Sequence, residues 1–207
     1  DDGRAGGVPQ EVRFPLTVGV AGTDISGGLA AWSSRGETLW ENPHGAGRMG
    51  VDVITHGEFW GAAPGGGCQH QWGTSVSCPV VVGVLAMLLS SVAPGPRRDA
   101  LRSPAALKQV LARGSARMGG NASHLEQGVG QLDVGATARA FSTFAPHLSA
   151  QPASLDLTDC PYLWPYCDQP LYATAQPLLL NVTLLNSAAP RSRLAAPPRW
   201  IADANGD

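Results

Sequence analysis

The sequence predicts an α/β fold, with strands and covering helices over residues 1–149 and a β-rich segment over residues 150–207. Three observations predict this arrangement. A short segment rich in Val ends in glycine, as a buried strand does before a turn. A long apolar run follows a serine-containing turn and has the length of a helix. After Pro146 the helical pattern gives way to short β-like pieces punctuated by prolines.

The first third of the chain holds the strand candidates. Residues 16–21 predict a buried strand, because Val, Thr and Leu dominate and a glycine follows for the turn. Residues 30–36 predict a short strand that runs into a polar turn, and residues 51–55 predict another short strand. Residues 61–67 predict a glycine-rich loop that leads to Cys68 and the serine turn.

The middle of the chain holds the helix candidates. Residues 74–92 are apolar on nearly all sides, which predicts a helix inside the domain. Residues 94–98 predict a loop. Ser103 then stands as an N-cap before a proline and an apolar face, so residues 103–112 predict an amphipathic helix covering the sheet. Residues 136–144 predict the terminal helix of this part.

The remaining segments are shorter. Residues 127–134 predict a glycine turn followed by a short segment, and residues 178–185 predict a β-like piece. Residues 188–198 predict a mobile loop. The change in pattern places a domain boundary near residue 150, and no internal repeat is present.

Composition excludes several function classes. The 207 residues carry a formal net charge of −2, with 43% hydrophobic and 14% charged residues, which gives no reason to expect nucleic acid or an anionic membrane surface as a partner. The longest apolar run is about half of the roughly 20 residues that a membrane span needs. The chain opens at Asp1 without an initiator Met or a signal segment, so we expect an internal fragment.

Cysteines and glycosylation motifs favour the lumen of the secretory pathway or the extracellular space. Cys160 and Cys167 would close an aromatic-rich loop if they are bonded. Asn121 and Asn181 each begin an Asn-x-Ser/Thr sequon. The alternatives are two free thiols and chance sequons. No second Cys or His pair stands at metal-ligand spacing, so we expect no metal site.

The segment Gly73-Thr74-Ser75-Val76-Ser77-Cys78-Pro79 carries the chemistry. It predicts a nucleophilic Ser75 on a tight turn at the start of a buried helix, where backbone N–H groups and the helix dipole favour an oxyanion. Pro79 is tolerated in the first turn of a helix. The alternative is an ordinary structural turn. A lipase-like hydrolase is disfavoured because Ser75 lacks the Gly-x-Ser-x-Gly pattern.

Ser75 needs a histidine as general base and a carboxylate to orient it. The chain has five histidines: His44, His56, His70, His124 and His147. His70 is close to Ser75 in sequence, but its glycine-rich surroundings favour a surface histidine. Asp24 weakly resembles a catalytic Asp-Ser/Thr-Gly motif, yet no His-Gly-Thr motif follows it. We therefore expect an incomplete triad within these residues.

The serine segment resembles that of the subtilase (subtilisin/kexin-like) family. Further segments resemble one branch of this family, whose members act in the secretory pathway: residues 32–41, 47–49, 66–68, 79–81, 126–133 and 157–167. The last segment is specific, because subtilases in general lack it. The resemblance implies that residues 1–149 form the C-terminal half of a subtilisin-like three-layer domain with a parallel sheet. It also implies that residues 150–207 begin a β-rich companion domain with a Cys160–Cys167 disulfide.

The resemblance also implies a serine endopeptidase that cleaves luminal or membrane-bound precursor polypeptides through Ser75. It implies a propeptide and a membrane anchor in the full-length protein, and a catalytic Asp and His upstream of this chain, which would be inactive alone. No cofactor is required. Subtilases often bind structural calcium, but no carboxylate cluster here supports it. Asp1 falls near the family's oxyanion-hole Asn, although a one-residue misalignment is the alternative.

Several positions depart from the family pattern. Cys78 stands before the proline where Ser or Thr is usual, and His56-Gly57 stands where Ala-Pro-Gly is frequent. Trp72 replaces a small residue beside the serine turn and could narrow the substrate pocket. These departures support an alternative function, a catalytically dead pseudoprotease or interaction module. The pairing of Cys68 with Cys78 stays open.

Overall fold

The computed structural model describes residues 17–37, 45–164, 166–168, 179–189, 195–199 and 201. Its central sheet has the strand order β1-β3-β7-β6. The strands are β1 (Val20–Thr23), β3 (Val53–His56), β7 (Gln131–Leu132) and β6 (Ser115–Ala116). The first three run parallel, and β6 is antiparallel to β7. The predicted α/β class is confirmed, with a sheet that is mixed at this edge.

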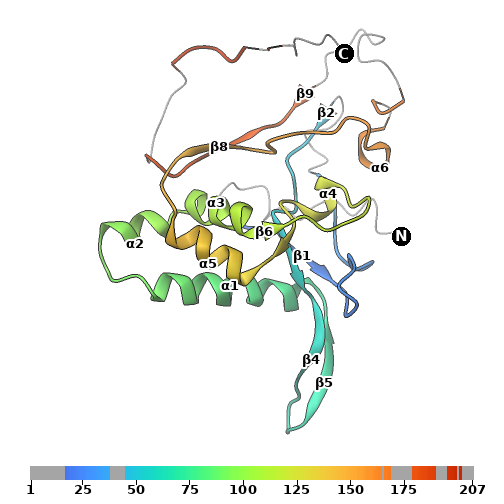
Figure 1. Ribbon diagram of the computed structural model, residues 1–207. Helices are drawn as coiled ribbons and strands as arrows, with labels where there is room; N and C mark the ends of the chain where they lie inside the picture. The colour runs from blue at the N-terminus through green and yellow to red at the C-terminus, as the bar shows by residue number, and fades with distance from the viewer. Residues whose placement is uncertain are drawn as a thin grey trace.

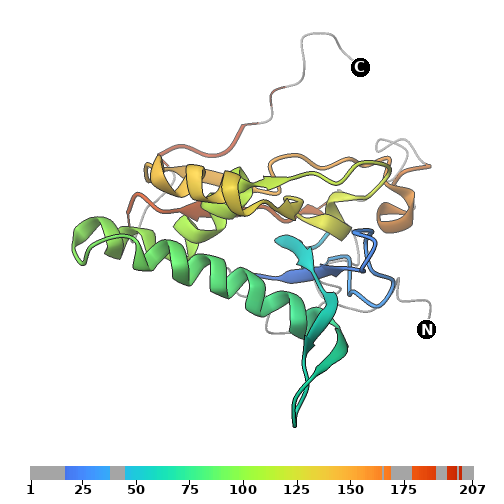
Figure 2. The same ribbon diagram turned by 60° about the horizontal axis from the view of Figure 1, so that its bottom comes forward.

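Helix α1 (Thr74–Ser90) packs against β1 and β3 with one face. The prediction that it lies inside the domain is wrong in part, because Val82 and Met87 on its other face are 58% and 54% exposed. The helix buries Val81, Val84 and Leu88, and it ends two residues before the predicted end. Val81 joins Val53 of β3 and a leucine of α3 in one core cluster. Figure 2 shows α1 running along one side of the molecule, next to the layer that the later helices form.

Helices α3 (Pro104–Gly114) and α5 (Val134–Ser142) pack closely against each other. Gly114 allows this approach, because a Cβ there would lie 2.4 Å from the Cα of Thr137. Ser103 is the N-cap of α3 as predicted, but its side chain makes no capping hydrogen bond. The predicted loop at 94–98 is wrong in part, since α2 (Pro96–Leu101) begins within it and buries Leu101 in the core.

Two further predictions at the serine end of the sheet are corrected. The segment 61–67 is only the tip of a hairpin formed by β4 (Glu58–Ala62) and β5 (Cys68–Trp72), which extends away from the body of the molecule (Figure 1). Both strands are largely exposed, so no buried apolar pattern marks them in the sequence. The strand predicted at 30–36 is absent. Turns occupy it, because Ser33 N–H bonds back to Ala30 O.

The C-terminal part contributes short strands. β8 (Leu148–Gln151) pairs antiparallel with β10 (Thr183–Asn186), and β9 (Leu179–Leu180) pairs parallel with β2 (Gly45–Ala46). The β-like piece predicted at 178–185 is thus confirmed as β9 and most of β10. Two short helices complete the described elements: α4 (His124–Gln127) and α6 (Cys160–Leu163). Among the described residues, no helix has the length and apolar character that crossing a membrane requires.

Candidate active site

The serine turn is fixed by backbone hydrogen bonds at the start of α1. Gly73 has φ 129°, a conformation that strongly favours glycine. Its N–H donates to Gly57 O at 2.9 Å, and its carbonyl accepts from Val76 N–H at 3.0 Å and Ser77 N–H at 3.3 Å. Ser75 lies inside this turn with its side chain exposed. The turn therefore presents the Ser75 hydroxyl to solvent at the N-terminus of α1, which packs on the sheet with one face.

The first turn of α1 is packed tightly against the ends of β1 and β3. Ser77 is fully buried, and a Cβ on Gly57 would lie 2.5 Å from Ser77 Oγ and 2.5 Å from Trp32 Cη2. A Cβ on Gly22 would also lie 2.5 Å from Trp32 Cη2. Only glycine fits at these two positions. The Trp32 ring and Ser77 thus fill the space between both strand ends and the helix that carries Ser75.

An aromatic pair flanks the turn. The rings of Trp32 and Trp72 have centroids 6.0 Å apart and an interplanar angle of 48°. Trp72, directly before Gly73, is 59% exposed. A large indole therefore stands beside the nucleophile position, as expected from the sequence, and offers an apolar surface to a bound chain.

The two weak candidates for base and acid have other partners. His70 Nε2 lies 2.9 Å from Glu58 Oε1, across the hairpin of β4 and β5. Asp24 accepts hydrogen bonds from Ser26 Oγ at 2.5 Å and Gly28 N–H at 3.0 Å within its own turn. The bond from Ser26 lowers the pKa of Asp24. Both groups serve local structure.

The other described histidines also have partners away from Ser75. His56 Nδ1 lies 3.5 Å from Thr23 Oγ1, and His147 Nδ1 lies 2.9 Å from Ala145 O. His124 interacts with Arg117. None of the four histidines in the described part of the chain is hydrogen bonded to Ser75, while His44 and Asp1 lie outside the described residues.

The cysteines fall into two classes. Cys160 and Cys167 form a disulfide with an S–S distance of 2.00 Å, whereas Cys68 and Cys78 are free and exposed. Within the described ranges, only Cys160, Cys167 and Asp168 bring three possible metal ligands together. Both sulfurs belong to the disulfide, so this group offers no thiolate to a metal.

The two sequons lie at accessible positions. Asn121 is exposed and lines a cavity of about 490 Å³ between α4 and α6. Asn181 is partly exposed in the connection between β9 and β10. Ser123, the third residue of the first sequon, is also the N-cap of α4, and its hydroxyl bonds to Asp159.

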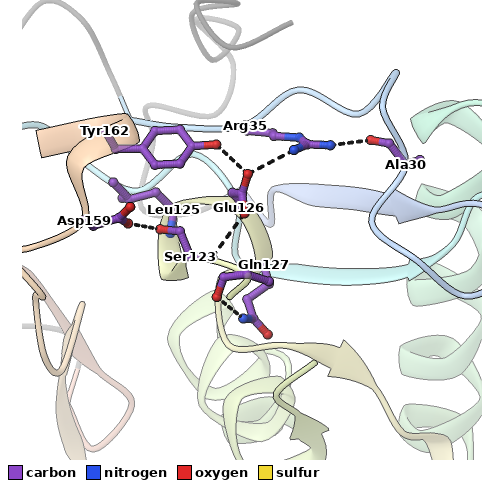
Figure 3. Close-up of polar contacts among 9 residues, drawn as sticks. Ala30, Arg35, Ser123, Leu125, Glu126, Gln127, Asp159 and Tyr162 are labelled. Atoms are coloured by element: carbon purple, nitrogen blue, oxygen red, sulfur yellow. Dashed lines mark hydrogen bonds and ion pairs between the residues drawn. The ribbon is translucent and has the colours of Figure 1, made fainter. Parts of the chain in front are cut away.

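A polar network around Glu126 was not predicted from the sequence. Glu126 Oε1 accepts from Tyr162 Oη at 2.7 Å and from Arg35 Nη1 at 2.9 Å, while Oε2 accepts from Ser123 N–H at 3.1 Å (Figure 3). The Ser-x-x-Glu spacing is a capping-box pattern that predicts the last contact. The partners Arg35 and Tyr162 are too distant in sequence for any pattern to reveal.

This network shifts the pKa values of Glu126 and Tyr162. Burial opposes the charge of Glu126, but the hydrogen bonds from Tyr162, Ser123 and Arg35 outweigh it and lower the pKa of Glu126 below its usual value. Burial, then the hydrogen bond to Glu126 and its negative charge, raise the pKa of Tyr162 well above its usual value. The pair is therefore held as a carboxylate and a protonated phenol.

Comparisons with known proteins agree with this arrangement. Residues 2–130 match the family model described as the subtilase family. Residues 151–207 match the model described as the third Ig-like domain of MBTPS1. The structure shares its fold with the CspB protease of Clostridium perfringens, with a TM-score of 0.51 and 21% identity over 61% of this chain and 27% of that one.

Curated relatives extend the match across both regions. The subtilisin-like protease SBT6.1 of Arabidopsis thaliana is 41% identical over 184 residues, which cover 88% of this chain and 18% of that protein. The membrane-bound transcription factor site-1 protease of Homo sapiens is 40% identical over 88% of this chain and 17% of its own length. The chain therefore spans less than a fifth of either relative.

Proposed function

Because the chain belongs to the subtilase family, we propose that it is the serine-bearing part of an endopeptidase whose nucleophile is Ser75. The observation that supports this proposal most strongly is the position of Ser75, which is exposed in the first turn of α1 two residues after the positive-φ Gly73. A nucleophilic serine needs such a turn, because its hydroxyl must reach a carbonyl carbon from a rigid support.

In the proposed reaction, Ser75 Oγ attacks the carbonyl carbon of a peptide bond while a histidine accepts its proton. The resulting oxyanion collapses, the C–N bond breaks, and the histidine returns the proton to the leaving amine. Water then hydrolyses the acyl-enzyme by the same sequence of steps. The N-terminus of α1 directs unpaired N–H groups and the positive end of its dipole toward the oxyanion.

By resemblance to the family, we place the catalytic Asp and His upstream of residue 1. The histidines that the structure describes support this, since each has a partner other than Ser75. The isolated chain should then show no amidase activity and no labelling of Ser75 by a fluorophosphonate probe. Robust labelling of the isolated chain would contradict the absence of a base.

The decisive comparison uses the longer protein that contains the upstream Asp and His. Ser75→Ala should abolish labelling and reduce turnover by several powers of ten. Ser90→Ala, at the far end of the same helix, is the matched control and should leave both unchanged. Loss of labelling in Ser90→Ala, or its retention in Ser75→Ala, would contradict the assignment of Ser75 as the nucleophile.

The second candidate is a pseudoprotease or interaction module that keeps the subtilase fold without catalysis. It is favoured by Trp72, whose exposed ring beside the serine turn could bind a chain without cleaving it. The two functions differ in one readout. A folded longer protein that binds peptides but neither labels with the probe nor cleaves them would establish this second function.

We further propose that the substrates are membrane-bound precursor polypeptides in the lumen of the endoplasmic reticulum or Golgi, with a propeptide and a membrane anchor in the full-length protein. The 40% identity to site-1 protease and the disulfide support this location. We also propose N-glycans at Asn121 and Asn181. In a secretory host, Asn121→Gln and Asn181→Gln should each increase gel mobility by one glycan, and unchanged mobility would remove the site concerned.

Two further assignments stay proposals. The domain boundary near residue 150 is supported by family matches that end at residue 130 and begin at residue 151. Asp1 is placed at the oxyanion position by resemblance. If it occupies that position, Asp1→Asn in the longer protein should raise turnover, because one oxyanion donor is worth roughly 100–1,000-fold. No change would favour the misalignment.

A further inference from the structure

We propose that the disulfide-closed segment 160–167 helps to position the serine turn, and that Tyr162, Glu126 and Arg35 are positioning residues for the nucleophile. The inference rests on the proposed function in one respect, the identity of Ser75 as the nucleophile. It goes beyond that function by linking the β-rich part of the chain to the geometry of the active site.

The first step joins the disulfide segment to α4. Tyr162 Oη donates to Glu126 Oε1 at 2.7 Å, and Asp159 bonds to the Ser123 hydroxyl (Figure 3). The Tyr162 ring also lies against Gly36, since a Cβ there would be 3.8 Å from Tyr162 Cε1. The side chain of Tyr162 thus contacts both α4 and the segment around Gly36, which are distant from it in sequence.

The second step joins α4 to the segment that carries Trp32. Arg35 Nη1 donates to Glu126 Oε1 at 2.9 Å, and its Nη2 donates to Ala30 O at 2.9 Å. Arg35 and Glu126 are only 20% and 17% exposed, so solvent screens this pair less than a surface pair. The guanidinium therefore holds the carbonyl of Ala30 at a fixed distance from Glu126.

The third step joins Ala30 to Trp32 and the end of β1. Ala30 N–H donates to Gly22 O at 3.1 Å, and Ser33 N–H closes a turn on Ala30 O at 3.1 Å. Gly22 N–H in turn donates to Ser33 Oγ at 3.1 Å. The turn that presents Trp32 is thereby held on one side by β1 and on the other by Arg35.

The last step reaches the nucleophile. The Trp32 ring packs against Gly22 and Gly57, Ser77 Oγ lies against the same two glycines, and neither glycine has room for an added Cβ. The Trp32 ring also pairs with that of Trp72. Ser77 and Trp72 lie on either side of Ser75 in sequence. A displacement of Trp32 must therefore move the first turn of α1 or open a void beside it. Misplacing a reacting group by about 1 Å can cost roughly 100-fold in rate.

The two carboxylate oxygens of Glu126 have different partners, which argues against a merely local role for the network. Oε2 completes the capping box of α4 with Ser123 N–H, so the helix start needs neither Tyr162 nor Arg35. Oε1 makes both long-range contacts. Replacing Tyr162 removes one of these and leaves the cap of α4 in place.

The test uses Tyr162→Phe in the longer protein with its upstream Asp and His, and Tyr166→Phe in the same disulfide segment as the matched control. Active sites are titrated with a fluorophosphonate, and kcat is expressed per titrated site. We expect Tyr162→Phe to lower this kcat about tenfold, because a shift of the serine turn by less than 1 Å should cost less than the roughly 100-fold of a full 1 Å misplacement. A merely structural role would reduce the number of titrated sites and leave kcat per site unchanged, which would overturn the proposal.

A second readout does not depend on activity. The near-ultraviolet circular dichroism of the Trp32–Trp72 pair is isolated as the difference between the parent and Trp72→Phe. Tyr162→Phe should weaken this signal, and Tyr166→Phe should preserve it. An unchanged signal in Tyr162→Phe would overturn the link to Trp32. A weakened signal in a protein that never labels at Ser75 would uphold the link and refute the proposed function instead.

Discussion

Lys108 of α3 and Asp52, just before β3, form an ion pair with Nζ 2.9 Å from Oδ2, and each side chain is only 9% exposed. Asp52 also accepts from Gly19 N–H at 2.7 Å and from Gln151 Nε2 at 2.7 Å. Its carboxylate therefore joins the sheet, a covering helix and β8. Such a buried charge is tolerated because every partner is present.

Lys108→Met should destabilise the protein by about 3–5 kcal/mol, because it leaves the Asp52 carboxylate buried without its cation. Urea unfolding measures the change. Arg113→Met, at the exposed end of the same helix, is the control. Its free energy of unfolding should stay within about 0.5 kcal/mol of the parent's. Adding Asp52→Asn to Lys108→Met should recover part of the loss, and a further loss of similar size would contradict the unpaired-charge explanation.

Gly57→Ala should lower the free energy of unfolding by about 1–3 kcal/mol, because the added Cβ would lie 2.5 Å from Ser77 Oγ and from the Trp32 ring. The paired control is Gly83→Ala in α1, where a Cβ meets nothing within 4 Å. This second change should stabilise the helix by roughly 0.5–1 kcal/mol. Thermal unfolding of both variants checks the prediction, which fails if the two shifts have the same sign.

Gln109→Ala should loosen the β8–β10 pair. Gln109 Nε2 donates to His147 O, Ser149 Oγ and Leu185 O at 2.9–3.0 Å, and its carbonyl accepts from Ser187 Oγ at 2.5 Å. Each buried group left unsatisfied costs about 1–3 kcal/mol. Hydrogen exchange should accelerate at the amides of β8 and β10, while Gln69→Ala on the exposed hairpin should leave them unchanged. Equal rates in both variants would refute the anchoring role.

Stability should fall as acid protonates Glu126. Since folding lowers the pKa of Glu126, its contribution is present above the unfolded value near 4.5 and is lost as pH falls through the lower folded pKa. Glu126→Gln removes this contribution, so its unfolding free energy should vary less with pH over that interval. Tyr162→Phe should show an intermediate slope. Parallel pH profiles for Glu126→Gln and the parent would contradict this assignment.

Local pattern was sufficient where a feature depends on neighbouring residues. The apolar run after Ser75 predicted α1, and Ser103 followed by proline predicted the start of α3. The same reasoning missed β5, because an exposed strand in a projecting hairpin buries no alternating apolar face. It predicted a strand at 30–36, where the hydrogen bonds that Ala30 and Ser33 make to β1 and to each other impose turns instead.

The sequence by itself determined the serine turn, the apolar helix that follows it, the family and the candidate disulfide, since each depends on residue types within a few positions of one another. Only the tertiary structure decided which partners the charged groups take. Glu126 meets Tyr162 and Arg35 across 36 and 91 residues, and Lys108 meets Asp52 across 56. Those pairings arise from how helices and strands pack, because a side chain's partner across the fold is set by the position of its whole element.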